Sequence, residues 1–242
     1  MLAKVLSGVN TRLLVSERNK LSLSETVFGS VGARAVLPLM RWAYRKADGI
    51  VAVSKGVEDD LAQALTLPLE QIPVVYNPVV TQELLGKDQA YLEHPWLSHE
   101  KLPVILDVRW PTKHKNLPSL IRAFAKVRLQ RDCRLVILGE GELRLELETL
   151  VQEVDIEDSV QLPGFFDNPF AWMSRASLLV LSSAWEGLPN ALIQAKACGV
   201  AVVSTDCPSG PAEIIEDARW GRLVPVGDVN ALCCAMIETI TE

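Results

Sequence analysis

The sequence predicts an α/β protein whose core is a doubly wound parallel sheet. The clearest observation is a unit in which the apolar run Leu178–Leu181 precedes the polar loop Ser182–Pro189. A helical stretch, Ala191–Cys198 with Asn190 as its expected N-cap, and a second apolar run, Val200–Ser204, follow. Such a unit joins two parallel strands, and the same alternation recurs through the second half of the chain. Ligands of such sheets bind beyond the carboxyl ends of the strands.

Residues 1–78 hold too few strands for a complete sheet of this kind. The expected strands are Thr11–Ser16, Gly49–Ser54 and Ile72–Tyr76. Apolar spacing predicts a helix over Val31–Ala47, and Ser54 is the expected N-cap of another that runs to about Leu65. Three acidic residues favour the start of this second helix through its dipole: Glu58, Asp59 and Asp60.

Residues 79–242 hold a nearly complete sheet. The polar stretch Thr81–Lys101 is expected to be an irregular linker or capping segment. The expected strands are Pro103–Val108, Arg134–Leu138, Ser159–Leu162, Leu178–Leu181, Val200–Ser204 and Gly221–Val226. The expected helices are Leu117–Leu129, one ending near Val154, Asp167–Met173, Ala191–Cys198, one beginning at Pro211, and Ala231–Thr241.

The composition excludes several classes of protein. The 242 residues, 49% apolar and 22% charged, suit one large or two small globular domains. The net charge of −6 argues against binding to nucleic acid. Five cysteines without a CxxC pair indicate reduced thiols, as in the cytoplasm. No apolar run approaches the roughly 20 residues of a membrane helix, and the start lacks a signal-peptide pattern.

The string EGLPNALIQAKACGVAVVSTDCPSGPAEII, residues 186–215, resembles the donor-binding segment of retaining glycosyltransferases of the GT-B fold, family four. The hallmark of that segment is two glutamates eight positions apart, which correspond here to Glu186 and Gln194. A second stretch, ADGIVAVSKGVEDDLAQ followed by VVYNPV, resembles the end of that family's first domain, with Asn77-Pro78 at the crossover into the second.

The resemblance implies two Rossmann-like domains. Residues 1–78 would be the C-terminal part of an incomplete acceptor-side domain, and residues 79–242 the nucleotide-sugar donor-binding domain. The chain is therefore expected to be truncated at its N-terminus relative to the family. A nucleotide diphosphate sugar, most simply a UDP-sugar, would be the donor, and no cofactor or metal is expected because the chain contains no Asp-x-Asp pair.

The leaving diphosphate carries about two negative charges and needs donors or cations that are already in place. The basic loop Arg109–Asn116 and the helix that begins near Asn190 would supply them. Lys115 matches the lysine of the family's glycine-and-arginine loop. Aligning on Lys115 puts Trp110 at the family's arginine, Arg109 at its glycine and Asp107 at another glycine. The implied catalytic residues are Glu186, Lys115 and Arg109. A solvated basic loop is the alternative for both Arg109 and Lys115.

The resemblance also implies donor-binding positions, in which Glu186 lies at the donor sugar and Gln194 accepts from the ribose hydroxyls. The complete donor-binding set is Gly187, Leu188, Pro189, Asn190, Gln194, Gly164 and Phe165, of which the last two would meet the base. The alternatives are an ordinary exposed glutamine at 194 and a tight turn with a core aromatic at 164–165. Gly139-Glu140-Gly141 lacks the lysine of a phosphate loop.

The expected function is hexosyl transfer, with retention, from a nucleotide diphosphate sugar to a glycan or lipid-linked acceptor of a surface polysaccharide. The alternative is an inactive remnant that at most binds nucleotide. Other sugar-nucleotide enzymes of this fold, such as epimerases, need acid–base side chains that the sequence does not offer. The cations of the first predicted helix suit either a solvated face or peripheral contact with an anionic membrane surface: Arg34, Arg41, Arg45 and Lys46.

Overall fold

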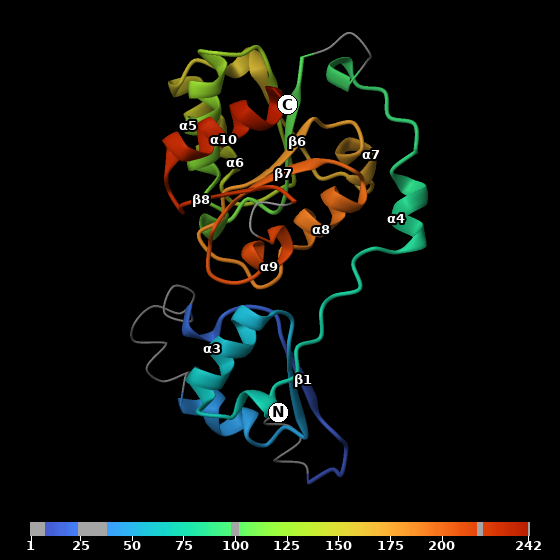
Figure 1. Ribbon diagram of the computed structural model, residues 1–242, viewed down its shortest axis with the longest axis vertical. Coiled ribbons are helices and arrows are strands. Elements are labelled where there is room, and N and C mark those ends of the chain that lie inside the picture. Colours follow the sequence, from blue (N-terminus) through green and yellow to red (C-terminus); the bar gives the residue numbers. More distant parts are fainter. Residues whose placement is uncertain (1–7, 24–37, 98–101, 217–219, 242) are drawn as a thin grey trace. The chain divides into compact units, whose positions relative to one another are not determined.

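The computed structural model describes residues 8–23, 38–97, 102–216 and 220–241 (Figure 1). The chain divides into two compact units. The first consists of Met1–Asn77, Glu186–Leu188 and Pro208–Glu213, and the second of Pro78–Trp185, Pro189–Cys207 and Ile214–Glu242.

A parallel sheet of six strands forms the centre of the second unit. The strands are β3 (Val104–Val108), β4 (Arg134–Leu138), β5 (Val160–Gly164), β6 (Leu178–Leu181), β7 (Ala201–Thr205) and β8 (Arg222–Val224). Their order in the sheet is β5-β4-β3-β6-β7-β8, and every neighbouring pair is parallel. The chain thus builds outward from β3 in one direction, returns to β6 and builds outward in the other, which confirms the predicted doubly wound fold class.

Helices cover both faces of this sheet because successive side chains of each strand point to opposite faces. Ile105, Leu135 and Val180 pack into one buried cluster, under α5 (Leu117–Arg128), α6 (Arg144–Glu153) and α10 (Val229–Thr241). Leu106, Val136 and Leu179 pack into the other, under α7 (Phe170–Met173) and α8 (Asn190–Ala197). The ribbon shows the two groups of helices on opposite sides of the strands (Figure 1).

Two predictions for the second unit need correction. The stretch Thr81–Lys101 was expected to be irregular, but its described part contains the short helix α4 (Gln82–Lys87), capped by Thr81, whose hydroxyl accepts from Leu84 N at 3.2 Å. Asn190 was expected to be the N-cap of α8, but it is the first helical residue; Pro189 is the N-cap, without a side-chain hydrogen bond.

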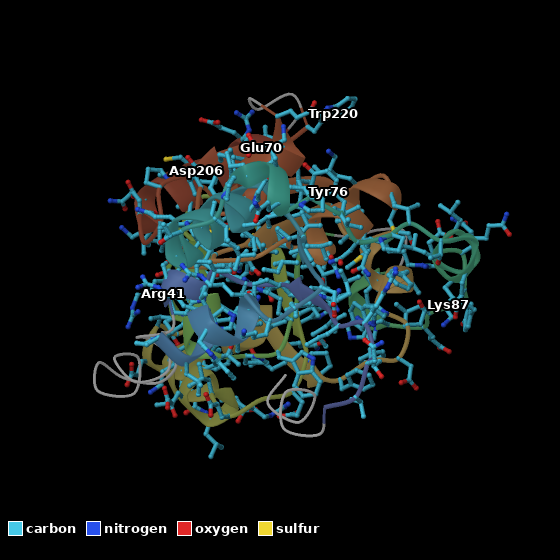
Figure 2. All side chains as sticks on the ribbon, turned by 90° about the horizontal axis from the view of Figure 1, so that it is seen from below. Arg41, Glu70, Tyr76, Lys87, Asp206 and Trp220 are labelled. Carbon is cyan, nitrogen blue, oxygen red and sulfur yellow. The ribbon has the colours of Figure 1, made fainter. Side chains whose placement is uncertain are left out.

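The segment that contains α4 folds along the second unit. Ser174 Oγ donates to Asp88 O at 2.7 Å, and Asn168 Nδ2 donates to the carbonyl of Lys87, which ends α4 (Figure 2). His94 lies against Trp172, with ring centroids 4.7 Å apart. The segment is therefore a cap on the second unit, which was one of the two predicted descriptions of it.

In the first unit, β1 (Leu14–Glu17) pairs in parallel with β2 (Gly49–Ala52), and α3 (Lys55–Leu65) follows. Ser54 caps α3 as predicted, because its hydroxyl accepts from Val57 N at 3.3 Å. The strand predicted over Ile72–Tyr76 is reduced to one bridge between Ala52 and Val74. Pro73 has no N–H to donate, which limits the ladder there. Short 3₁₀ turns cover Leu21–Leu23 and Leu69–Gln71.

The helix predicted over Val31–Ala47 is described only from residue 38, and residues 38–44 are helical. Two of its cations donate hydrogen bonds to backbone carbonyls at the end of α3. Arg41, which is labelled in Figure 2, donates from Nε to Ala64 O at 2.6 Å. Arg45 donates to Leu65 O at 3.4 Å. Cations are favourable at the last carbonyls of a helix. Arg34 lies outside the described residues.

The buried thiols should react slowly with thiol reagents. Burial raises the pKa of Cys133 to about 11 and also raises that of Cys233, whereas Cys234 is exposed. The thiolate is the reactive form, so a raised pKa leaves almost no thiolate at pH 8. We expect a thiol reagent at pH 8 to modify Cys234 rapidly and Cys133 only on unfolding, as followed by mass spectrometry. A Cys234→Ser variant should lose the fast phase, and rapid labelling of Cys133 in the folded protein would contradict this assignment.

Candidate functional site

The turning point of the doubly wound sheet lies between β3 and β6. The two strands pair in parallel, with Ile105 opposite Leu178 and Leu106 opposite Leu179. The chain segments that follow them therefore leave the sheet at the same edge. This edge, where the direction of strand addition reverses, is the usual ligand position in open α/β sheets. The predicted catalytic residues Arg109 and Lys115 follow β3, and Glu186 follows β6.

Lys115 lies in a 3₁₀ turn, Lys113–Lys115, called here the Lys115 turn. Lys115 is partly buried, and its backbone N–H donates to Thr112 O at 2.9 Å. Asn116 follows with φ 49° and ψ 40°, a left-handed conformation that asparagine tolerates, and α5 begins at the next residue. The turn is therefore fixed at both ends by local hydrogen bonding and by a helix.

The Lys115 turn is bonded to the first residues after β6, Ser182–Trp185, called here the β6 segment. Ser182 Oγ donates to Lys115 O at 2.9 Å, and Ala184 N donates to His114 O at 2.7 Å. The rings of His114 and Trp185 stack, with centroids 5.1 Å apart. The two segments that follow β3 and β6 thus form one continuous hydrogen-bonded structure.

Arg109 does not lie in a solvated loop, because only 8% of its surface is exposed. Its Nε donates to Asp107 Oδ1 at 2.9 Å, and Nη2 is bonded to Asp107 Oδ2. Nη1 donates to Ser183 Oγ at 2.6 Å, and Nη2 also reaches Ser182 Oγ at 3.2 Å. Asp107 is fully buried. The predicted alternative of a solvated Arg109 is therefore wrong, and the guanidinium is a buried, charge-paired group.

The turn after β4 supports the same region. A Cβ added to Gly139, whose φ is +134°, would lie 1.8 Å from Arg109 O, and one added to Gly141 would lie 2.8 Å from Pro111 O. Only glycine permits this approach of backbone to backbone. Gly139-Glu140-Gly141 therefore packs against the loop after β3, a role that its sequence does not reveal.

Gly164 ends β5 with φ 88°, and its carbonyl accepts from Gly139 N at 2.8 Å. Arg144 steadies this strand end, since it donates to Leu162 O at 2.7 Å and pairs with Glu140 at 2.8 Å. Phe165 is 64% exposed, so it is not the core aromatic of the predicted alternative.

The remaining predicted residues divide between the two units. Glu186, Gly187 and Leu188 belong to the first, and all three are buried; Glu186 N donates to Pro208 O at 3.4 Å. Pro189, Asn190 and Gln194 belong to the second. Asn190 opens α8 and is exposed, and Gln194, one helical turn further on, is partly buried. A helix of this length carries partial positive charge at its first turn, where an anion is favoured.

Sequence reasoning missed Ser182, Ser183 and the stack of His114 on Trp185. Their one signal was position, because Ser182 and Ser183 follow directly after β6, and His114 and Trp185 lie in the segments that follow β3 and β6. His94, by contrast, lies in the α4 segment, and its Nε2 is 2.9 Å from Gln161 Oε1 of β5. His99 lies outside the described residues. Within the described ranges, no three His, Cys, Asp or Glu side chains gather as metal ligands would. No helix in those ranges has the length and apolar character to span a bilayer.

Comparison with known families agrees with this fold. Residues 104–242 match the model of the family described as "Glycosyl transferases group 1", and residues 24–83 match "Glycosyltransferase Family 4". The chain belongs to the group 1 glycosyl transferases. The first match covers more than half of the chain and contains every predicted site residue.

Curated relatives of this group 1 glycosyl transferase are longer than it is. One relative is a Campylobacter jejuni enzyme named N-acetylgalactosamine-N,N'-diacetylbacillosaminyl-diphospho-undecaprenol 4-alpha-N-acetylgalactosaminyltransferase. The two sequences are 37% identical over 227 residues, and the aligned region covers 93% of this chain and 59% of that protein. This chain is also 26% identical over 204 residues to N-acetyl-alpha-D-glucosaminyl L-malate synthase of Bacillus anthracis. That aligned region covers 84% of this chain and 53% of the synthase. The chain thus spans between half and three-fifths of the length of these relatives.

Solved structures share the fold. HepE of Anabaena, in complex with UDP and glucose, gives a TM-score of 0.79 at 21% identity and covers all of this chain and 64% of its own. Sucrose-phosphate synthase of Thermosynechococcus elongatus gives a TM-score of 0.81 at 21% identity. The superposed region covers 99% of this chain and 61% of the synthase chain.

The close approach at Gly139 generates a stability prediction. Gly139→Ala should lower the free energy of unfolding more than Gly227→Ala does. Both glycines have positive φ, but no described atom lies within 4 Å of a Cβ at Gly227. The shared backbone strain costs about 1 kcal/mol, and the contact with Arg109 O should add roughly 1–3 kcal/mol. Urea unfolding of the two variants measures the difference, and equal destabilisation would show that the turn does not support Arg109.

Proposed function

We propose that this chain binds the nucleotide diphosphate sugar of a retaining hexosyltransferase, with a UDP-sugar as donor and a glycan or lipid-linked acceptor. The observation that carries the proposal is the Lys115 turn, bonded to the β6 segment at the turning point of the sheet. The segment leads directly through Glu186 to the start of α8. Family membership and the solved HepE complex with UDP support the class of donor.

In the proposed reaction the leaving diphosphate gains negative charge as the sugar–phosphate bond breaks. The Lys115 ammonium supplies a point charge, and the first turn of α8 supplies backbone N–H groups and a partial positive charge. Both are in place before the reaction, so they stabilise the transition state without reorganisation. No metal is needed for this charge balance. Glu186 positions the sugar, and an oxygen of the donor's own phosphate takes the proton of the acceptor hydroxyl.

A second candidate function is nucleotide binding without transfer. Gln194 stands where the family has a charged acceptor, and Arg109 is engaged by Asp107. Both departures weaken the donor site relative to the family pattern. Donor hydrolysis by the purified chain distinguishes the two candidates, because a protein that only binds nucleotide leaves the sugar–phosphate bond intact.

The role of Lys115 can be tested by calorimetry with UDP. Lys115→Ala should weaken UDP binding by about 1.5–3 kcal/mol, at least tenfold, because it removes a charge-assisted contact with the diphosphate. Lys87→Ala is the matched control, since Lys87 is an exposed lysine of α4 paired with Glu83 at 2.7 Å. Equal UDP affinity in the wild type and Lys115→Ala would remove Lys115 from the site.

Transfer activity can be tested by slow hydrolysis of a UDP-sugar. The wild type should release UDP, and Glu186→Ala should reduce the rate by at least about 100-fold, the scale of one lost positioning contact. Chromatographic detection of released UDP measures it. Hydrolysis that persists in Glu186→Ala would remove Glu186 from the site, whereas a wild type that binds UDP without hydrolysing its sugar ester would favour the second candidate.

Gln194→Glu should tighten UDP binding by about 1–2 kcal/mol, because a carboxylate is a stronger acceptor than an amide for the ribose hydroxyls. The gain should be smaller with 2′-deoxy-UDP in the same calorimetric titration. Gln152→Glu, at an exposed position of α6, controls for the added charge. An equal gain for both nucleotides would argue that residue 194 does not meet the ribose.

A further inference from the structure

Most of the hydrogen-bond donors of the Arg109 side chain already have protein partners. A guanidinium has five N–H donors, and four of those of Arg109 are directed at Asp107, Ser182 and Ser183. The Arg109 and Asp107 side chains are only 4% and 0% exposed. A diphosphate that used this guanidinium would have to displace a bidentate carboxylate and leave Asp107 as an uncompensated buried charge.

The bonds of Arg109 lead to Lys115. Ser182 accepts from Arg109 Nη2 and donates from the same Oγ to Lys115 O. Ser183 accepts from Nη1, and its own carbonyl accepts from Thr205 Oγ1 at 2.6 Å, which ties the β6 segment to the end of β7. The hydroxyl of Ser182 is thus oriented by Arg109 toward the backbone of the Lys115 turn.

The neighbouring residue increases the importance of this connection. Trp110 stands at the position where the family pattern has its arginine, and its side chain is 67% exposed. An indole carries no positive charge, so it cannot replace a cation opposite the diphosphate. The cationic contribution from the segment after β3 then comes from the turn that holds Lys113 and Lys115, and it depends on where that turn is held.

We infer that Arg109, anchored by Asp107, is a positioning residue: it fixes the Lys115 turn through Ser182 and does not itself bind the diphosphate. The inference rests on the proposed function for the identity of the ligand. It goes beyond that function in assigning Arg109 an internal role, and the pair Asp107–Arg109 stands where the family pattern has two glycines.

The two possible roles of Arg109 predict opposite signs for one substitution. If Arg109 bound the diphosphate, Asp107→Asn would free the guanidinium, remove a repelling carboxylate and tighten UDP binding. If Arg109 positions the turn, Asp107→Asn removes its anchor and should weaken UDP binding about tenfold, the effect of losing roughly one charge-assisted contact. Binding of uridine, which has no phosphates, should stay within about twofold, whereas general loss of structure would weaken both ligands.

Ser182→Ala is the milder variant, because it leaves the Asp107–Arg109 pair intact and removes only the bond to Lys115 O. It should weaken UDP binding several-fold, by about the value of one neutral hydrogen bond. Ser174→Ala is its matched control: it also removes a hydroxyl-to-carbonyl bond, that to Asp88 O at 2.7 Å. Arg109→Gln should weaken UDP binding, and adding Ser182→Ala to it should weaken that binding little further. Arg122→Gln, at an exposed position of α5, should leave UDP binding unchanged.

Amide hydrogen exchange supplies a readout that needs no ligand. The N–H groups of Lys115 and Asn116 donate within the turn, to Thr112 O and Lys113 O. Their exchange should be faster in Ser182→Ala and in Arg109→Gln, and unchanged in Ser174→Ala. Faster exchange in the two variants, together with a wild type that binds no UDP, would support the positioning of the turn and refute the proposed function. Unchanged exchange in both variants, or tighter UDP binding by Asp107→Asn, would overturn the inference.

Discussion

β3 and β6 share only two registered positions, yet their pairing brings the segment that holds Arg109 and Lys115 to the segment that holds Ser182 and Ser183. It joins the first strand of one half of the sheet to the first strand of the other, and it sends two chain segments out at one edge. Without that pairing, Lys115 and Ser182 would be 67 residues apart in the sequence with no reason to meet. The hydrogen bonds from Ser182 to Lys115 O and from Ala184 to His114 O are consequences of it.

The electrostatics of this edge follow from burial. A charge that leaves water must be paired, and Asp107 and Arg109 meet that requirement with a bidentate contact inside the protein. Their mutual neutralisation removes Arg109 from the set of cations that face solvent. The positive features that remain in the segments after β3 and β6 include the exposed Lys113, the partly exposed Lys115 and the first turn of α8. This division explains how a sequence with a basic loop can offer a more modest cationic surface than its composition indicates.

Parts of this structure could be read from the sequence with accuracy. Arg134–Leu138 and Leu178–Leu181 are strands with the predicted bounds, because strands buried on both faces appear as uninterrupted apolar runs. The cap at Ser54 was predictable for an equally local reason. By contrast, α4 is short and is held by contacts with Asn168 and Ser174, which no local pattern reveals. The partners of Arg109 were also beyond sequence reasoning, since Ser182 and Ser183 reach it only through strand pairing. The sequence could indicate the edge of the sheet but not which cation is paired there.

The fold of the α4 segment has a practical consequence for dissecting the protein. Leu92, Trp96 and Leu97 pack against the apolar cluster that contains Trp172, and Arg134 lies over the Trp96 ring at 4.8 Å. A fragment that began at the first strand of the large sheet would lose this cover and present indole and aliphatic surface to water, which favours self-association. An expression boundary for the isolated second unit therefore belongs ahead of Thr81, some twenty residues before the point at which strand content alone would set it.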